Sequence, residues 1–459
     1  MRDKLQKWTC FKKASSIILI LDFLLFGLLG YWMPLVGDDL NWWSTWGQNY
    51  FFNGTFLNYD GRYLGDLLII LMSHLPIISF LIYGFCGSLL AYLIARILRI
   101  IFPHSNYYLR LVLSSLALLL LPRSIFRQIW GWHAGFANYG PSLIFPLFFI
   151  ALTLKYWNNK QHPQFNHSWL LFISAIAAQF LAEHITLLNC LNIVLVLILG
   201  RQHLTSSFKK QYLKPLALGN FLGAILMFCN GAYVRVLMGK DTYRSVGQVQ
   251  QDTLINYLKN LFVGRPHLML AMLIFVFVLV VLCWLNWQRF HNRLLLVTNC
   301  WLLLSATVSQ APFIVISPYG PRCQFVFVIF LWLIILLNIL PWLNLAPRIF
   351  SVLVTLFFLF TGIKFDHIAY DYHQTFVVAT ALSIEQGRQH VKHTYVLNYR
   401  DVNFIWATNS SWDANFKAYF VNPESKVVPV DYQTWQDLSQ GLNLKQKHDR
   451  SILLQRLNK

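Results

Sequence analysis

Long apolar runs alternate with short polar segments through the first 365 positions of the chain. Each run has about 18 or more residues, enough for a helix to cross a hydrocarbon core of about 30 Å. The first run should remain in the protein as a helix, because it is long and lacks a small-x-small cleavage site. The pattern predicts eleven membrane-spanning helices, near positions 14–34, 77–101, 107–122, 141–157, 168–184, 185–200, 215–234, 267–287, 293–312, 322–340 and 349–365.

The pattern changes after position 365, where polar and aromatic residues mix and no run is long enough to span a membrane. Segments 394–399 and 426–430 predict short strands, 412–421 a helix between them, and 442–459 a basic helix or a frayed end. We therefore expect an all-α polytopic membrane domain over 1–365 and a small extracytoplasmic α/β domain over 366–459.

Composition supports a membrane protein over a soluble one. Of 459 residues, 56% are hydrophobic and 12% are charged, whereas soluble proteins carry about 25% charged residues. This excludes the roughly three soluble domains that the length alone would allow. The seven cysteines are scattered without a CxxC pair, which excludes a disulfide framework and a cysteine metal site.

The net charge of +19 is distributed unequally between the two predicted sides of the membrane. Cytoplasmic loops are enriched in Lys and Arg, so the basic amino terminus should be cytoplasmic. The predicted inner loops then hold 17 of the 37 basic residues, the outer loops nine, and the region from Lys364 eleven. The basic excess is thus mostly an orientation signal and not a nucleic-acid site. No glycine-rich phosphate-binding motif is present, so nothing suggests nucleotide hydrolysis.

The first predicted outer segment contains adjacent carboxylates, Asp38 and Asp39, followed by Trp42 and Trp43 and then by Asp60 and Arg62. Carboxylates at a membrane edge are costly unless they are used or hydrated. One could bind a metal or a positive group while the other accepts a proton. The alternative is that both only cap the helix that begins at Leu40.

The second outer segment contains Arg123 and Arg127, which are four residues apart and so share one face of a helix. The pair could hold a phosphate. Alternatively, it anchors the chain to lipid headgroups beside interfacial tryptophans. His133 could carry a proton or bind a metal, but a lone loop histidine commonly does neither. The segment's further candidate contacts to a substrate are Trp132, Asn138 and Tyr139.

The remaining outer polar residues form smaller groups. Glu183 and His184 should face a cavity or a partner, and Glu183 could instead form a salt bridge with an outer arginine such as Arg322. Arg322 is a candidate anion ligand. Arg235, Lys240, Tyr243 and Arg244 could contact a polyanionic lipid or glycan, or could form a solvated loop. Asp22 could face a water path, or could be half of a hydrogen-bonded polar pair between helices.

The chain resembles the GT-C class of membrane glycosyltransferases, and is most similar to the bacterial branch with the serotype-converting glucosyltransferase II type and related membrane proteins. One residue differs from the family: position 184, after Glu183, is His184, where many members of the family have Asn or Thr. The resemblance covers most of the membrane part and rests on Gly37-Asp38-Asp39, Asp60-Gly61-Arg62-Tyr63, Trp132 to Asn138-Tyr139, Glu183 and Pro321-Arg322.

The resemblance implies a GT-C-like hexosyltransferase in the bacterial plasma membrane that takes a sugar from a polyprenyl-phosphate donor on the outer face. The acceptor would be a hydroxyl of a cell-surface polysaccharide, a teichoic acid or a lipid, and in-line displacement would invert the anomeric centre. Asp38 or Asp39 would be the general base. Arginines, or a divalent Mg or Mn ion, would stabilise the departing phosphate; no cofactor is certain. The candidate phosphate ligands are Arg62, Arg123, Arg127 and Arg322.

Two other functions remain open at this stage. A transporter or flippase for a lipid-linked glycan or an anionic solute should show broken helices, paired repeats and charges near the middle of the membrane. The sequence has only Asp22 there, and no repeat. A non-catalytic assembly subunit would tolerate the loss of both Asp38 and Asp39.

Overall fold

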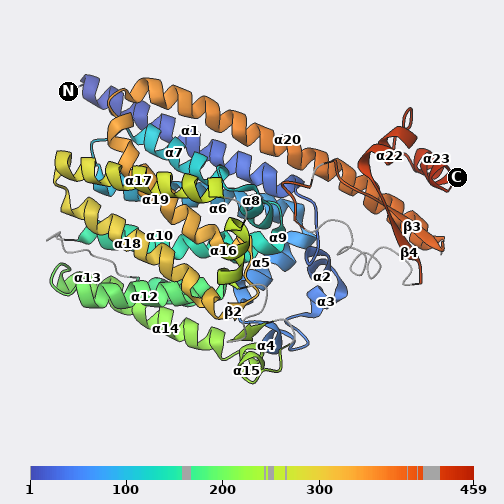
Figure 1. Ribbon diagram of the computed structural model, residues 1–459, viewed down its shortest axis with the longest axis horizontal. Helices are drawn as coiled ribbons and strands as arrows, with labels where there is room; N and C mark the ends of the chain where they lie inside the picture. The colour runs from blue at the N-terminus through green and yellow to red at the C-terminus, as the bar shows by residue number, and fades with distance from the viewer. Residues whose placement is uncertain are drawn as a thin grey trace.

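The computed structural model describes residues 2–157, 167–241, 244–246, 253–263, 266–389, 391–400, 402–406 and 424–458. Long helices lie side by side in a bundle, with the N-terminus at one end and a small C-terminal lobe at the other (Figure 1). We call these the amino end and the lobe end. Among the described residues, six helices are long and apolar enough to cross a membrane, or eight if two bent pairs count as single spans.

Each predicted apolar run coincides with a helix, so the expectation of an all-α membrane domain is confirmed. Eleven crossings remain a prediction, because some of these helices are short; α11, for example, has 11 residues. The matching helices are α1 (Arg2–Trp32), α6 (Pro76–Ile101), α7 (Tyr107–Leu119), α10 (Ile144–Tyr156), α11 (Ser168–Ala178), α12 (Glu183–Leu199), α14 (Lys214–Phe228), α17 (Pro266–Phe290), α18 (Arg293–Gln310), α19 (Phe325–Leu343) and α20 (Pro347–Arg388).

Small elements gather towards the lobe end. The chain bends by 91° between α7 and α8, where Pro122 cannot continue a helix. It bends by 66° before α15. Strands β1 (Ser245–Val246) and β2 (Ile316–Ser317) pair antiparallel. The short helices are α2 (Asp39–Trp43), α3 (Thr45–Asn49), α4 (Phe56–Tyr59), α5 (Tyr63–His74), α8 (Arg123–Ile129), α9 (His133–Tyr139), α15 (Gly231–Leu237) and α16 (Leu254–Phe262).

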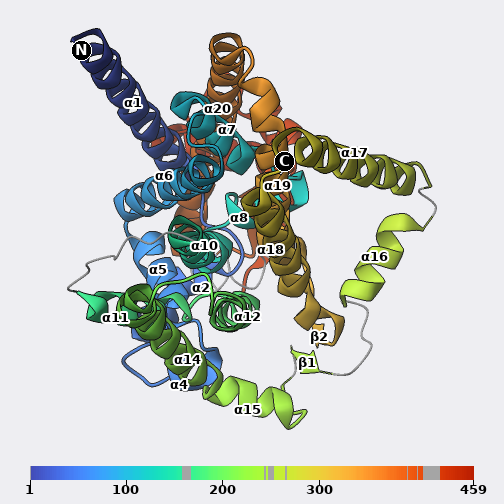
Figure 2. The same ribbon diagram turned by 90° about the vertical axis from the view of Figure 1, so that its left-hand side faces the viewer.

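The helices pack at different depths in the bundle. Viewed from the amino end, α10 lies among other helices, whereas α17 projects at the periphery and leads back to α16 (Figure 2). Glycines allow α1 and α6 to approach closely, as small residues do between membrane helices. A Cβ added at Gly30 would lie 2.4 Å from the Tyr83 ring.

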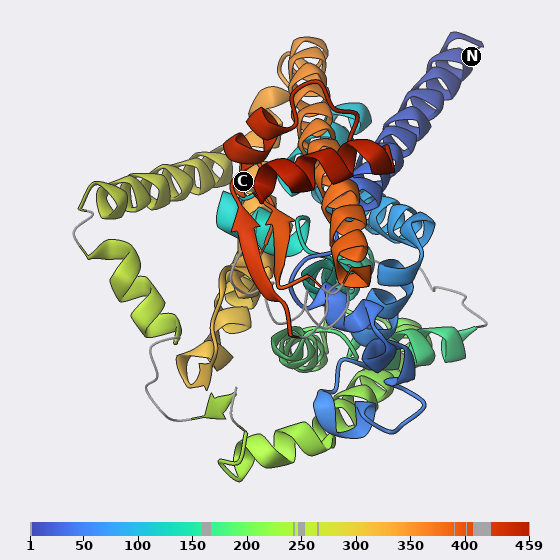
Figure 3. The same cartoon turned by 90° about the vertical axis from the view of Figure 1, so that its right-hand side faces the viewer.

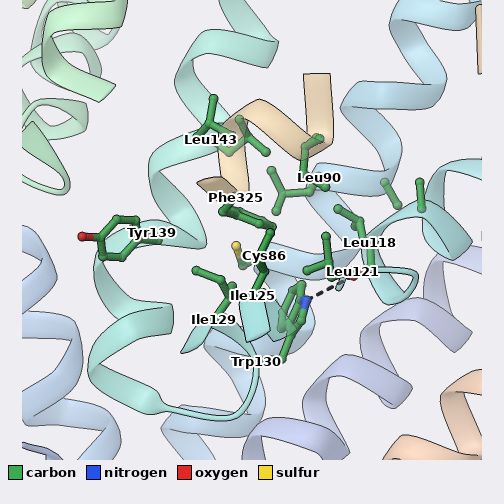
Figure 4. Packing of buried hydrophobic residues seen from close by; sticks show 14 of the residues in the cluster. Cys86, Leu90, Leu118, Leu121, Ile125, Ile129, Trp130, Tyr139, Leu143 and Phe325 are labelled. Carbon is green, nitrogen blue, oxygen red and sulfur yellow. Dashed lines mark hydrogen bonds between the residues drawn. The ribbon is translucent and has the colours of Figure 1, made fainter. Parts of the chain in front are cut away.

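The core beneath the lobe-end loops is formed by a large cluster of buried apolar side chains. Trp130 is fully buried, and its indole N–H donates to the carbonyl of Leu118 over 3.1 Å (Figure 4). Deeper in the bundle, Ser115 donates to a carboxylate oxygen of Asp22 over 2.8 Å. Asp22 is therefore half of a polar pair between α1 and α7, the less functional of the two interpretations.

The C-terminal lobe contains two short strands and two helices among the described residues. Helix α20 runs unbroken for 42 residues, so the predicted boundary between 365 and 366 falls inside it. Strands β3 (His393–Leu397) and β4 (Lys426–Val430) pair in parallel, and α22 (Tyr432–Leu438) and α23 (Lys447–Leu457) pack nearby (Figure 3). The helix predicted at 412–421 lies outside the described residues.

Candidate functional site

Asp39 is fully buried and holds two lobe-end segments together. One carboxylate oxygen accepts the amide of Ala134 over 2.8 Å. The other accepts the amides of Val36 over 3.1 Å and His133 over 3.4 Å. Because these amides belong to the start of α9 and to the segment before α2, Asp39 positions the two helices. The predicted cap of the helix near Leu40 is not formed: α2 begins at Asp39, and Asp38 before it makes no side-chain cap hydrogen bond. Asp39 instead binds the first amides of α9.

Asp38 has a different environment from its neighbour. Its side chain is exposed to solvent, yet enough protein surrounds it that desolvation raises its pKa above the ordinary carboxylate value. The charge of Asp39 raises this pKa further, and the guanidinium of Arg322 lowers it. Asp38 is therefore an accessible carboxylate with increased basicity that lies within electrostatic reach of an arginine.

Arg62 and Glu183 form an ion pair between the turn before α5 and the start of α12. The Nε of Arg62 lies 3.0 Å from both carboxylate oxygens of Glu183, and Nη2 lies 2.8 Å from one of them. The Tyr233 hydroxyl also donates to this carboxylate over 2.9 Å. Both charged side chains retain 22% exposure. The sequence suggested Arg322 as the salt-bridge partner of Glu183. The partner in the structure is Arg62.

Asp60 joins this pair to a second arginine. It lies 3.9 Å from Arg62 and 3.8 Å from Arg244. The backbone carbonyl of Asp60 accepts the side-chain amide N–H of Asn230 over 2.6 Å, so the residue before α15 holds this turn in place. Arg244 also donates to the carbonyl of Tyr59 over 3.3 Å. The turn after α4 is thus fixed by contacts from distant parts of the chain.

Tyr139 links the Arg62 pair to Arg322. The guanidinium of Arg62 lies 6.0 Å from the Tyr139 ring centroid, and the Tyr139 hydroxyl lies 4.0 Å from the Cys323 sulfur. The ring borders the apolar core and its hydroxyl points away from it (Figure 4). The ring of His184 lies 5.6 Å from that of Tyr139, so this predicted residue also belongs to the group.

Arg322 lies over an aromatic stack. Its guanidinium lies 5.7 Å from the Trp132 ring, and Trp132 stacks on Trp406 with centroids 3.9 Å apart. The backbone amide of Arg322 donates to the side chain of Gln128 over 3.1 Å. We call the assembled group the lobe-end cluster; it consists of Asp38, Asp60, Arg62, Tyr139, Glu183, His184, Tyr233, Arg244 and Arg322.

Several predicted residues lie outside the lobe-end cluster. His133 is 2% exposed. With Trp43, it lines a separate cavity of about 240 Å³. Asn138 donates to the carbonyl of Ala134 over 2.9 Å and packs against α5. Trp42 is buried against Tyr50.

The two arginines of α8 also lie outside the lobe-end cluster. They are one helical turn apart, as the spacing predicts, since α8 begins at Arg123 and includes Arg127. Arg123 lies over the Phe404 ring at 5.8 Å. The Nε of Arg127 is buried without a hydrogen-bond partner.

Sequence reasoning missed three residues of this region. Tyr233 bonds Glu183, and Asp66 accepts the Tyr50 hydroxyl over 2.6 Å. Tyr59 is 40% exposed, and burial and the charges of Asp60 and Asp38 raise its pKa. No motif marks these residues; a polar side chain at the end of an apolar run was the only available signal.

The described residues contain no group of three or more His, Cys, Asp or Glu side chains arranged to hold a metal ion. The anionic groups of the lobe-end cluster are instead occupied by arginines, as with Asp60 and Glu183. Asp60 and Glu183 are therefore poorly placed to hold a resident Mg or Mn ion.

Comparisons of the chain with family models, curated proteins and solved structures gave no match. The geometry of the lobe-end cluster is therefore the basis for a functional conclusion.

Proposed function

We propose that the protein is a membrane glycosyltransferase that moves a sugar from a polyprenyl-phosphate donor to a hydroxyl of a surface glycan, a teichoic acid or a lipid, with the lobe end facing outward from the bacterial plasma membrane. One observation carries this proposal: Asp38 is an accessible carboxylate with a raised pKa that lies within electrostatic reach of Arg322. Glycosyl transfer needs a base for the acceptor and a cation for the leaving phosphate.

Asp38 acts as the general base in this mechanism. It removes the proton of the acceptor hydroxyl as the acceptor oxygen bonds to the anomeric carbon of the sugar. The bond between that carbon and the phosphate oxygen breaks, and its electron pair stays on the phosphate. Displacement from the opposite side inverts the anomeric centre. Asp39 is not available for this role, because it is fully buried and its oxygens already accept three backbone amides.

Arg322 stabilises the charge that develops on the leaving phosphate. Arg62 contributes less, because Glu183 already neutralises it at 2.8 Å. Instead, the Arg62–Glu183 pair fixes the turn at Asp60 and the position of Tyr139. Exposed rings such as Tyr59 offer a surface on which a sugar can stack. No step passes through a metal ion.

A lipid-linked donor agrees with the placement of the cluster. The cluster is built at the ends of helices: Arg62 precedes α5, Tyr139 ends α9, Glu183 begins α12, and Arg322 lies just before α19. A membrane-bound donor can reach such a site from the bilayer. Nucleotide sugars are not available outside the cell, so the leaving group must arrive already activated in the membrane.

A lipid transporter is the second candidate. The bent helix pairs favour it, since broken helices line the substrate sites of many transporters. The bend between α7 and α8 is 91°, and the bend before α15 is 66°. Sugar transfer and lipid translocation in proteoliposomes distinguish the two functions, because a transporter moves its lipid without changing the glycosidic bond.

The test of the enzyme is Asp38→Asn in native membranes supplied with polyprenyl-phosphate hexoses and a surface-glycan acceptor. Loss of a general base should lower transfer by about 10²- to 10⁴-fold. Asp371→Asn is the matched control, because Asp371 is an exposed carboxylate on α20 outside the cluster. Normal transfer by a well-expressed Asp38→Asn variant would overturn the catalytic proposal.

A further inference from the structure

A second groove lies apart from the lobe-end cluster. It has a volume of about 500 Å³ and is lined by side chains from α7, α17, α19 and α20 and by the turn into α8. Its walls are apolar: Leu120, Phe275, Leu331, Trp332 and Phe365 are among the lining residues. Trp332 donates its indole N–H to the carbonyl of Leu120 over 3.2 Å, which joins two of the walls.

Two cations, Arg123 and Lys364, line this otherwise apolar groove. Both side chains are exposed, and no acidic residue is among the groove's lining residues. Among the described residues, Arg123 contacts the Phe404 ring at 5.8 Å, and no carboxylate forms a salt bridge with it or with Lys364. Cations beside hydrocarbon are costly without a counter-charge. The groove therefore has the charge and polarity that complement one anionic group attached to an acyl chain.

We infer that this groove binds one anionic phospholipid of the bilayer, with its phosphate between Arg123 and Lys364 and an acyl chain along α17 and α19. Basic residues at a membrane surface attract anionic lipids in this way. The inference does not depend on the proposed function.

The position of the groove favours a bilayer phospholipid over the sugar donor. Phe404, which contacts Arg123, lies two residues before Trp406. Trp406 stacks on Trp132, and Arg322 lies on Trp132. A phosphate held by Arg123 is thus separated from Arg322 and Asp38 by these aromatic side chains. Arg123, a candidate donor ligand by sequence, is better placed for a structural lipid.

The experiment measures lipid retention by the full-length protein in detergent, using native mass spectrometry. The probes are dioleoyl phosphatidylglycerol, dioleoyl phosphatidylcholine and undecaprenyl phosphate, each added at the same concentration. We expect one phosphatidylglycerol to be retained in preference to phosphatidylcholine. Because each basic residue contributes about fivefold to anionic lipid binding, Arg123→Gln/Lys364→Gln should weaken retention about 30-fold.

Two further variants complete the test. Val328→Trp fills the groove between the helices and keeps both cations, so it should also release the lipid. Lys259→Gln is the matched control, since it removes an exposed cation on α16 away from the groove. Equal retention by wild type and the double variant, or retention of undecaprenyl phosphate alone, would refute the inference.

Discussion

The two ends of the helix bundle use arginine in different ways. At the amino end, Arg110 is 2% exposed. It donates to the carbonyl of Phe102 over 2.9 Å and to the hydroxyl of Ser105 over 2.8 Å. At the lobe end, Arg62 binds the carboxylate of Glu183. Arg110 is thus held by neutral oxygens, whereas Arg62 belongs to a group of opposite charges, and such groups can form a reactive site.

The largest expected effect is on sugar transfer, which should depend on Arg322 and not on Arg110. Arg322→Gln should lower sugar transfer by about 10²- to 10³-fold, because it removes the charge that stabilises the leaving phosphate. Its thermal stability should change little. Arg110→Gln should leave transfer per folded molecule unchanged. Both variants are assayed with a polyprenyl-phosphate sugar in membranes, and a comparable loss in Arg110→Gln would end the distinction between the two ends.

The second effect concerns stability. Arg62→Met leaves the carboxylate of Glu183 largely buried without its cation, which should cost about 2–3 kcal/mol of unfolding free energy. The double variant Arg62→Met/Glu183→Leu should recover part of this loss, because neither charge remains. Unfolding in detergent micelles measures both. A double variant that is less stable than the single would show that the pair stabilises the fold directly.

A smaller effect distinguishes the adjacent carboxylates. Asp39→Asn keeps one acceptor oxygen but loses the charge that binds the amides of Val36, His133 and Ala134. We expect a loss of about 1–2 kcal/mol in unfolding free energy. Asp38→Asn should be neutral or slightly stabilising, since its carboxylate is desolvated when ionised. Thermal unfolding of the two variants in the same detergent provides the comparison.

The sequence predicted the helices well because apolar length is a local property. Each predicted apolar run coincides with a helix, and both predicted strands of the lobe are present. The sequence could not predict that Asp39 is buried and bonded while Asp38 is accessible. This difference depends on backbone amides of α9, which are more than 90 positions away from Asp39. The sequence also could not predict that Glu183 binds Arg62, a pairing that joins α12 to the turn before α5.

The smallest expected effect is a change in pH dependence. A general base must be ionised, so transfer should fall as the pH drops through the pKa of Asp38. Desolvation and the charge of Asp39 raise that pKa. The acidic limb of the pH profile, where transfer falls, should therefore lie at a higher pH than for an ordinary carboxylate. Arg322 lowers the same pKa; the residual transfer of Arg322→Gln should therefore show its acidic limb at a still higher pH. An unchanged limb in Arg322→Gln would mean that the two groups do not act within one site.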